Sequence, residues 1–220
     1  MRLGLLGGTF DPIHRGHVAI ARGVRDRFAL DRLLLLPAGR PPHKADDALT
    51  PWAHRFAMAA LASLEMERIE ASAAEGGRGG ASYTVETLEE FRHGLEPGDL
   101  LLFALGSDSL FDLPNWREPR RVLELASLAV VPRPGAERAA LGRLDAEIAR
   151  RVIDLAAGPA TPAERLAPVG AVYWLDLPAD EVSGTGIRQR IRRGDGIGGL
   201  VPPAVAAYIA KYRLYAGGDD

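Results

Sequence analysis

The 220-residue chain has a formal net charge of −2 and 25% charged residues, so electrostatics give no reason to expect a nucleic-acid partner. The sequence has no cysteine, which excludes disulfides, thiol catalysis and thiolate metal ligands. No signal peptide is evident and no apolar run is long enough to cross a bilayer, so we expect a cytoplasmic protein without a membrane partner.

The first predicted elements enclose a glycine-rich turn. Leu3 to Leu6 is an apolar run of strand length, and residues 18–28 repeat apolar side chains at helical intervals. The turn between them begins with Gly7, Gly8, Thr9 and Phe10. Glycines at a strand end let a phosphate approach backbone N–H groups at the positive end of the next helix. This order favours a polyphosphate site, although Gly-Gly after a strand is also typical of a tight turn without a ligand.

Two histidines follow the turn. His14 and His17 are three residues apart, so on a helix they share one face and point toward whatever the turn amides hold. A metal site is the alternative for such a pair, but no cysteine or carboxylate cluster nearby completes a coordination shell. We therefore expect both imidazoles to contact phosphate oxygens. The turn is neither the G-x-G-x-x-G dinucleotide fingerprint nor a P-loop.

Strands and helices alternate along the rest of the chain. The predicted strands cover residues 33–36, 69–71, 100–105, 128–131 and 171–175. The predicted helices cover residues 50–64, 83–93, 118–125, 185–193 and 202–212, together with a long amphipathic helix over 136–157. Continuously apolar strands belong in parallel sheets, which bind ligands at the carboxyl ends of their strands. We expect an α/β fold, a Rossmann-like doubly wound parallel sheet, with residues 1–220 as a single domain and residues 183–220 as a small C-terminal helical extension.

A second polar segment precedes the helix over residues 185–193. Ser183 and Thr185 stand at its start, where hydroxyl groups cap amides or meet a phosphate, and Arg188 follows about one turn later. On charge pattern alone, the arginine-rich stretch 188–193 would be a solvated helix face. The hydroxyl residues before it favour an anion site in which Arg188 takes part.

These two segments resemble the nucleotidylyltransferase superfamily. His14, Gly16 and His17 match its H-x-G-H element, and residues 182–188 are similar to its I-S-S-T-x-I-R motif, with Gly184 in place of the second Ser. The resemblance implies that residues 1–220 form a nucleotidylyltransferase domain with His14, His17 and Arg188 as catalytic residues. It implies ATP contacts for Gly7, Gly8, Thr9, Phe10, Gly16, Ser183 and Thr185.

Further segments are similar to the bacterial nicotinate mononucleotide adenylyltransferases. The matches are P-P-H-K at residues 41–44, S-Y-T-x-x-T-L at 82–88, G-x-D…L-x-x-W at 106–116, and the tail over 200–215. The resemblance implies transfer of AMP from ATP to nicotinate mononucleotide, giving nicotinate adenine dinucleotide (deamido-NAD) and pyrophosphate in NAD biosynthesis. It implies a direct in-line attack without a covalent intermediate, with these two small molecules as partners.

The same resemblance implies roles for the remaining site residues. Lys44 would be catalytic and would contact the mononucleotide phosphate, while Tyr83, Thr84 and Trp116 would bind the nicotinate nucleotide. Asp108 would touch a ribose or a metal-bound water, and Arg133 would lie against the adenine. Mg²⁺ is the expected cofactor, carried mainly by the ATP phosphates, so no protein side chain is assigned as a metal ligand.

One position departs from this family in a way that bears on specificity. Arg117 stands where an aromatic residue usually follows the tryptophan, so either Trp116 stacks on the pyridine ring alone or Arg117 brings a charge near its carboxylate. The resemblance implies that backbone amides around Thr84 and a helix amino end recognise that carboxylate. Without the resemblance, Trp116 would be interpreted as a partly buried packing residue.

Other functions remain as alternatives. A related transferase would adenylylate phosphopantetheine or another phosphomonoester, and a nucleotide-binding sensor would bind ATP without catalysis. A hydrolase has no G-x-S-x-G elbow to support it. The sequence leaves open the oligomeric state, a homo-oligomer included, and whether residues 76–80 close over the substrate.

Overall fold

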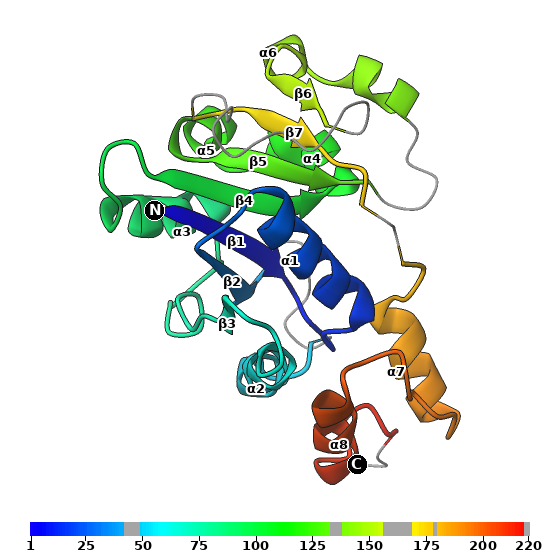
Figure 1. Ribbon diagram of the computed structural model, residues 1–220. Helices are drawn as coiled ribbons and strands as arrows, with labels where there is room; N and C mark the ends of the chain where they lie inside the picture. The colour runs from blue at the N-terminus through cyan, green and yellow to red at the C-terminus, as the bar shows by residue number, and fades with distance from the viewer. Residues whose placement is uncertain (42–48, 133–137, 156–168, 178–179, 218–220) are drawn as a thin grey trace.

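The computed structural model describes residues 1–41, 49–132, 138–155, 169–177 and 180–217. Its centre is a seven-stranded sheet in the order β3-β2-β1-β4-β5-β7-β6, in which every neighbouring pair is parallel. In Figure 1 the arrows of the sheet point toward the same side of the molecule. The strands are β1 (Arg2–Gly8), β2 (Arg32–Pro37), β3 (Ile69–Ala71), β4 (Leu100–Gly106), β5 (Ser127–Val131), β6 (Val152–Asp154) and β7 (Val172–Trp174). The predicted α/β class and doubly wound parallel sheet are confirmed.

Helices cover both faces of this sheet and enclose two hydrophobic cores. One core holds side chains of α1 (Arg15–Arg27), α2 (Trp52–Ser63), α7 (Gly184–Arg192) and α8 (Pro203–Lys211). The other holds side chains of α3 (Thr84–His93), α4 (Ser107–Asp112), the 3₁₀ helix η2 (Leu113–Asn115) and α5 (Pro119–Leu125).

The strand β2 is apolar without interruption because its side chains enter both cores. Leu33 and Leu35 belong to the first core, whereas Leu34 and Leu36 belong to the second. Successive side chains of a strand point to opposite faces, so a strand covered by helices on both sides needs apolar residues at every position.

The strand order places a crevice between β1 and β4. These strands are neighbours, but β1 continues to β2 on one side of the sheet and β4 continues to β5 on the other. The chain therefore diverges at their carboxyl ends, Gly8 and Gly106. Ligands of open α/β sheets bind at such a point. In Figure 1, α7 lies on the side toward which these arrows point.

The predicted long helix over residues 136–157 is wrong. Its described part consists of the 3₁₀ helix η3 (Arg138–Arg143), the short helix α6 (Ala146–Ala149) and the edge strand β6, while residues 136–137 and 156–157 lie outside the described part. Asp145 starts α6 as a new helix, because its side chain accepts a 2.8 Å hydrogen bond from the N–H of Glu147. Val152 pairs with Val172 of β7, and helical periodicity carries no information about such a distant strand partner.

Smaller differences concern the ends of helices. The helix predicted over residues 50–64 begins at Trp52, with Pro51 as its N-cap, and the short helix α4 after β4 was not predicted. Ser183 caps α7 as expected, since its hydroxyl accepts a 3.1 Å hydrogen bond from the N–H of Gly186. Within the described segments, no helix is both long and apolar enough to span a bilayer.

Candidate active site

A cavity of about 770 Å³ opens at the carboxyl ends of β1 and β4. Its wall is built from the turn after β1, the first turns of α1, α3 and α7, and the α4–η2 segment. The predicted site residues that line it are Gly7, Gly8, Thr9, Phe10, His14, Gly16, His17, Tyr83, Thr84, Asp108, Trp116, Ser183, Thr185 and Arg188. Lys44 and Arg133 lie outside the described residues. The fold thus brings together segments from the whole length of the chain.

The turn after β1 needs both of its glycines. A Cβ on Gly8 would lie 2.7 Å from the Phe10 ring, and a Cβ on Gly7 would lie 3.0 Å from the Phe103 ring. Phe10 has a φ of 51° and a buried ring, so the turn stores some backbone strain that packing holds in place. Glycine at both positions therefore lets the Phe10 and Phe103 rings pack against the backbone of the turn.

The histidine pair sits at the start of α1. His14 is the N-cap, and its ring stacks on that of His17 with centroids 3.8 Å apart and planes inclined by 30°. The backbone N–H of His14 donates a 3.3 Å hydrogen bond to Nδ1 of His17, which leaves Nε2 as the proton-bearing nitrogen of a neutral His17 ring. A Cβ on Gly16 would lie only 3.1 Å from Nδ1 of His14, so this glycine makes room for the stacked pair.

Arg188 reaches from α7 to the turn. Its Nη1 donates a 2.6 Å hydrogen bond to the carbonyl oxygen of Asp11, and its Nη2 donates to Oγ1 of Thr185 at 3.2 Å. A Cβ on Gly184 would lie 2.7 Å from the same Asp11 carbonyl oxygen. Gly184, which departs from the superfamily motif, therefore allows the turn and α7 to meet closely.

Asp11 is a site residue for which the sequence predicted no role. It is only 6% exposed, and its Oδ1 accepts a 2.7 Å hydrogen bond from the hydroxyl group of Tyr215. Nη1 of Arg188 lies 3.9 Å from the other carboxylate oxygen. Burial and the neighbouring carboxylate raise the pKa of Tyr215 far above its usual value, so its hydroxyl group stays protonated and remains a donor.

Arg55 was also missed, although it is the largest fully buried side chain of the described residues. Its guanidinium donates to four backbone carbonyl oxygens, those of Thr50 (2.9 Å), Thr9 (2.9 Å), Ala38 (2.7 Å) and Gly39 (3.1 Å). Burial lowers the pKa of its guanidinium below the usual value, but a guanidinium keeps its proton in proteins. Arg55 thus ties the turn after β1 to the segment after β2. Arg55 stands one helical turn before Met58 and Ala59, and this spacing indicates that it lies on the buried face of the helix.

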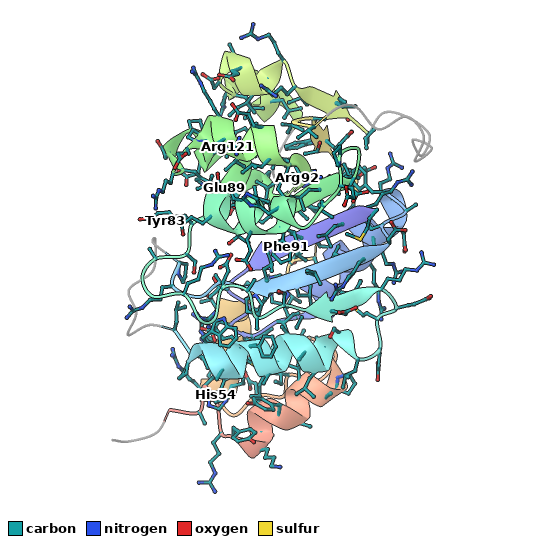
Figure 2. The ribbon with its side chains drawn as sticks, turned by 90° about the vertical axis from the view of Figure 1, so that its left-hand side faces the viewer. His54, Tyr83, Glu89, Phe91, Arg92 and Arg121 are labelled. Carbon is teal, nitrogen blue, oxygen red and sulfur yellow. The ribbon has the colours of Figure 1, made fainter. Side chains whose placement is uncertain are left out.

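Tyr83 and Trp116 form an aromatic part of the cavity wall, called the aromatic end below. Trp116 follows η2, is half-buried, and packs edge-to-face with Phe103 at a centroid distance of 6.4 Å. Tyr83 is the N-cap of α3 and Thr84 is its first residue. Figure 2 shows Tyr83 at the outer edge of the molecule, where α3 begins. Trp116 therefore combines the packing role with an indole surface on the cavity.

An ion pair joins the start of α1 to the segment before α7. Asp180 accepts two hydrogen bonds from Arg15, at 2.7 Å to Nε and 3.1 Å to Nη2. These bonds hold the pKa of Asp180 below its usual value. The N–H of Val182 and the nearby His14 lower this pKa further, by smaller amounts. The N–H of Arg15 also donates to the carbonyl oxygen of Leu200 at 2.9 Å. The C-terminal part is thereby fastened to the first turn of α1.

One end of the cavity therefore suits a polyphosphate, because turn amides, imidazoles and a guanidinium converge there. The other end suits a flat ring. A doubly wound parallel sheet carrying this combination, with a glycine turn that is followed by an H-x-G-H element, defines a nucleotidyltransferase of the nucleotidylyltransferase type.

Comparisons with known proteins are more specific. Residues 5–190 match the cytidylyltransferase-like family. The chain is 42% identical over 219 residues to a probable nicotinate-nucleotide adenylyltransferase of Geobacter sulfurreducens, covering 98% of this chain and 99% of that protein. It is 43% identical over 218 residues to one of a Roseiflexus species, covering 97% of each. In fold it resembles the Plasmodium falciparum nicotinic acid mononucleotide adenylyltransferase complexed with NaAD, with a TM-score of 0.71, 18% identity and 97% of each chain covered. The chain belongs to the nicotinate-nucleotide adenylyltransferase family of the cytidylyltransferase-like superfamily.

Proposed function

We infer that the enzyme transfers AMP from ATP to nicotinate mononucleotide, giving deamido-NAD and pyrophosphate in NAD biosynthesis. The observation that carries this inference is the cavity at the β1–β4 crevice, whose wall combines the glycine turn, the histidine pair and Arg188 with the rings of Tyr83 and Trp116. The near full-length similarity to nicotinate-nucleotide adenylyltransferases supports the choice of acceptor.

The proposed chemistry is a direct displacement. An oxygen of the mononucleotide phosphate attacks the α-phosphorus of ATP, a bond forms between them, and the bond to the bridging oxygen of pyrophosphate breaks. A phosphate monoester has a second pKa of about 6, so the nucleophile is already anionic at neutral pH and needs no general base. No covalent enzyme intermediate forms. The protein has to position two polyanions and neutralise the charge that develops between them.

We assign the ATP phosphates to the end of the cavity around the turn. The backbone N–H groups of Gly8, Thr9 and Phe10 and the Nε2 proton of His17 supply donors, with Gly7 and Gly16 keeping the space open. His14 supports the ring of His17 and contacts the phosphates beside it. Arg188 with Ser183 and Thr185 binds the β- and γ-phosphates, since the hydroxyl proton of Ser183 stays free to donate while its oxygen caps α7.

We assign the nicotinate nucleotide to the aromatic end. The indole of Trp116 stacks on the pyridine ring, and Tyr83 and the first amides of α3 around Thr84 lie beside it. Lys44 contacts the mononucleotide phosphate, Arg133 lies against the adenine, and Asp108 contacts a ribose or a metal-bound water. The last three assignments rest on the family resemblance, because two of these residues lie outside the described part and Asp108 is an exposed wall residue.

Mg²⁺ is part of this proposal as an ion that ATP carries. Among the described residues no group of three His, Cys, Asp or Glu side chains converges as a metal site. The carboxylate of Asp108 in the cavity wall is an oxygen donor of the kind that contacts Mg²⁺ through water, so the residues fit an ion held mainly by phosphates and water. The bound ion would neutralise charge on the phosphates.

We further propose that residues 1–220 work as one nucleotidylyltransferase domain in the cytoplasm. Ile187 of α7 and Val205 and Ile209 of α8 share a hydrophobic core with α1 and α2. The C-terminal helices are therefore packed as part of the main domain, and they carry the S-x-T-x-x-R motif into the cavity.

Pyrophosphate release from Mg²⁺-ATP tests the function. Purified protein would be assayed with nicotinate mononucleotide, nicotinamide mononucleotide and phosphopantetheine, and the product identified by mass. We expect fast turnover with the nicotinate nucleotide and formation of deamido-NAD. Turnover with phosphopantetheine alone would retain the adenylyl transfer and overturn the acceptor. ATP binding without pyrophosphate release from any acceptor would point to a sensor.

A further inference from the structure

The guanidinium of Arg117 has three neighbours at the aromatic end of the cavity, one of them Glu118, whose Oε1 lies 3.8 Å from its Nε. Its Cζ lies over the ring of Tyr83, 4.8 Å from the centroid, and its Nη1 donates a 2.8 Å hydrogen bond to Oε1 of Glu86. Tyr83 and Glu86 belong to the start of α3, whereas Arg117 lies between η2 and α5. Arg117 therefore closes the space beside Trp116 with a positively charged plane.

Few positively charged side chains line the described wall of the cavity, and Arg117 is one of them. Among the described residues of the wall, Arg117 and Arg188 are the arginine or lysine side chains. Arg188 is bonded to Asp11 and Thr185 at the phosphate end. An anionic group on a ring at the aromatic end would therefore meet Arg117, and it would meet no other described arginine or lysine of the wall.

We propose that Arg117 is the residue that selects the acid form of the pyridine nucleotide, by binding the ring carboxylate. This inference rests on the proposed function and adds to it a specificity residue at the position where the family usually has an aromatic side chain. The planar guanidinium donates to a carboxylate in parallel bonds, and stacking on Tyr83 limits the directions in which it can point.

Glu86 competes for the same guanidinium. The side chains of Arg117 and Glu86 are 50% and 40% exposed, and an ion pair so open to water is weak. A carboxylate on the substrate can therefore share or replace Glu86 at small cost. The negative charge of Glu86 also repels the acid nucleotide, so Glu86 moderates the preference that Arg117 creates.

The test compares the acid and amide mononucleotides in wild type, R117Q, R117K, E86Q and the R117Q/E86Q double variant. For the acid, we expect R117Q to lower kcat/KM by about 10- to 100-fold, mostly through KM, since the carboxylate is remote from the reacting phosphate. For the amide, kcat/KM should change by less than about threefold, because the amide group has no negative charge for Arg117 to bind. For R117K, kcat/KM with the acid should lie between the values of wild type and R117Q. E86Q should raise kcat/KM for the acid by about two- to fivefold, and only while Arg117 is present.

A second Arg–Glu pair that also reaches α3 is the matched control. Arg121 of α5 and Glu89 of α3 form an ion pair at 3.2 Å, and Figure 2 shows the two residues near each other. Neither residue lines the described cavity wall. The variants R121Q and E89Q remove the same kind of surface contact and should leave the ratio of acid to amide activity unchanged.

Binding without ATP separates this inference from the proposed reaction. Calorimetric titration of each mononucleotide into wild type and R117Q should show the same loss of acid affinity. Equal losses for acid and amide, or no loss for either, would overturn the role of Arg117. Selective acid binding that R117Q abolishes, in a protein without turnover, would support Arg117 and overturn only the reaction. A wild type that binds neither nucleotide would overturn both.

Discussion

The hydroxyl group of Tyr215 donates a 2.7 Å hydrogen bond to the carboxylate of Asp11, which lies 204 residues earlier in the chain. Asp11 is also the residue whose carbonyl oxygen holds Arg188. Arg213 and Tyr215 have φ values of 50° and 66°, a conformation that is costly for non-glycine residues and that must be offset by contacts. The C-terminal tail therefore supports the turn after β1 through the buried carboxylate of Asp11.

The substitution Tyr215→Phe should show this support. It removes the donor and leaves Oδ1 of the buried Asp11 short of a partner, which costs about 1–3 kcal/mol of unfolding free energy. A displaced Asp11 also misplaces Arg188, so KM for ATP should rise several-fold while KM for the mononucleotide changes little. Urea unfolding and initial rates measure the two effects. Tyr212→Phe, at a side chain that is 50% exposed, is the control, and equal behaviour of the two variants would contradict the prediction.

Arg55 should be irreplaceable by lysine. An ammonium group has three donors on one atom and does not span the four carbonyl oxygens that the guanidinium reaches. We expect Arg55→Lys to lower the unfolding free energy by about 3 kcal/mol or more, because a buried charge loses partners. Urea denaturation would measure the loss, with the exposed Arg22→Lys as the matched exchange. Equal stability of the two variants would show that the carbonyl contacts contribute little.

Replacing Gly184 by alanine should be harmful, although the same exchange usually stabilises a helix. In an ordinary helix, replacing glycine by alanine stabilises by up to about 1 kcal/mol. At residue 184 the added Cβ would lie 2.7 Å from the backbone oxygen of Asp11, so Gly184→Ala should push α7 from the turn and raise KM for ATP by roughly tenfold. The control is Gly196→Ala, where a Cβ would meet nothing within 4 Å. Unchanged ATP kinetics in Gly184→Ala would refute the close contact.

His17 should act on the transition state more than on the fold. Removing one well-placed donor to a developing oxyanion lowers turnover by about 100-fold or more, and we expect this of His17→Ala. The exposed His93→Ala is the control, and the melting temperatures of both variants should stay close to that of wild type. Turnover near the wild-type value in His17→Ala would remove this residue from the catalytic group.

The Asp180–Arg15 contact predicts how stability depends on pH. The pKa of Asp180 is lower in the folded protein than in the unfolded chain, so the contact stabilises fully above the unfolded value and is lost as pH falls through the folded one. The difference in unfolding free energy between wild type and Asp180→Asn should be constant from pH 7 to about pH 5 and should shrink below about pH 4. Urea unfolding at a series of pH values measures it. A difference that stays the same down to pH 3 would mean that the ion pair does not contribute.

The elements that were predicted correctly have local causes. The uninterrupted run Leu33 to Leu36 indicates a strand buried on both faces, because no polar side chain has to meet water there. Ser183 caps a helix three residues before the amide that it accepts from. The glycine turn and the histidine pair likewise lie within a dozen residues of each other, and both line the cavity as their spacing predicts.

The sequence by itself therefore determined the fold class and which residues of the glycine turn, the histidine pair and the start of α7 line the cavity. Only the tertiary structure decided the strand order, the strand β6, the bond from Tyr215 to Asp11, the four carbonyl contacts of Arg55 and the place of Arg117 over Tyr83. The physical reason is distance along the chain: backbone hydrogen bonds and side-chain periodicity act between near neighbours and leave a pattern. A contact between residues far apart depends on how helices and strands pack, so it leaves no pattern in the sequence.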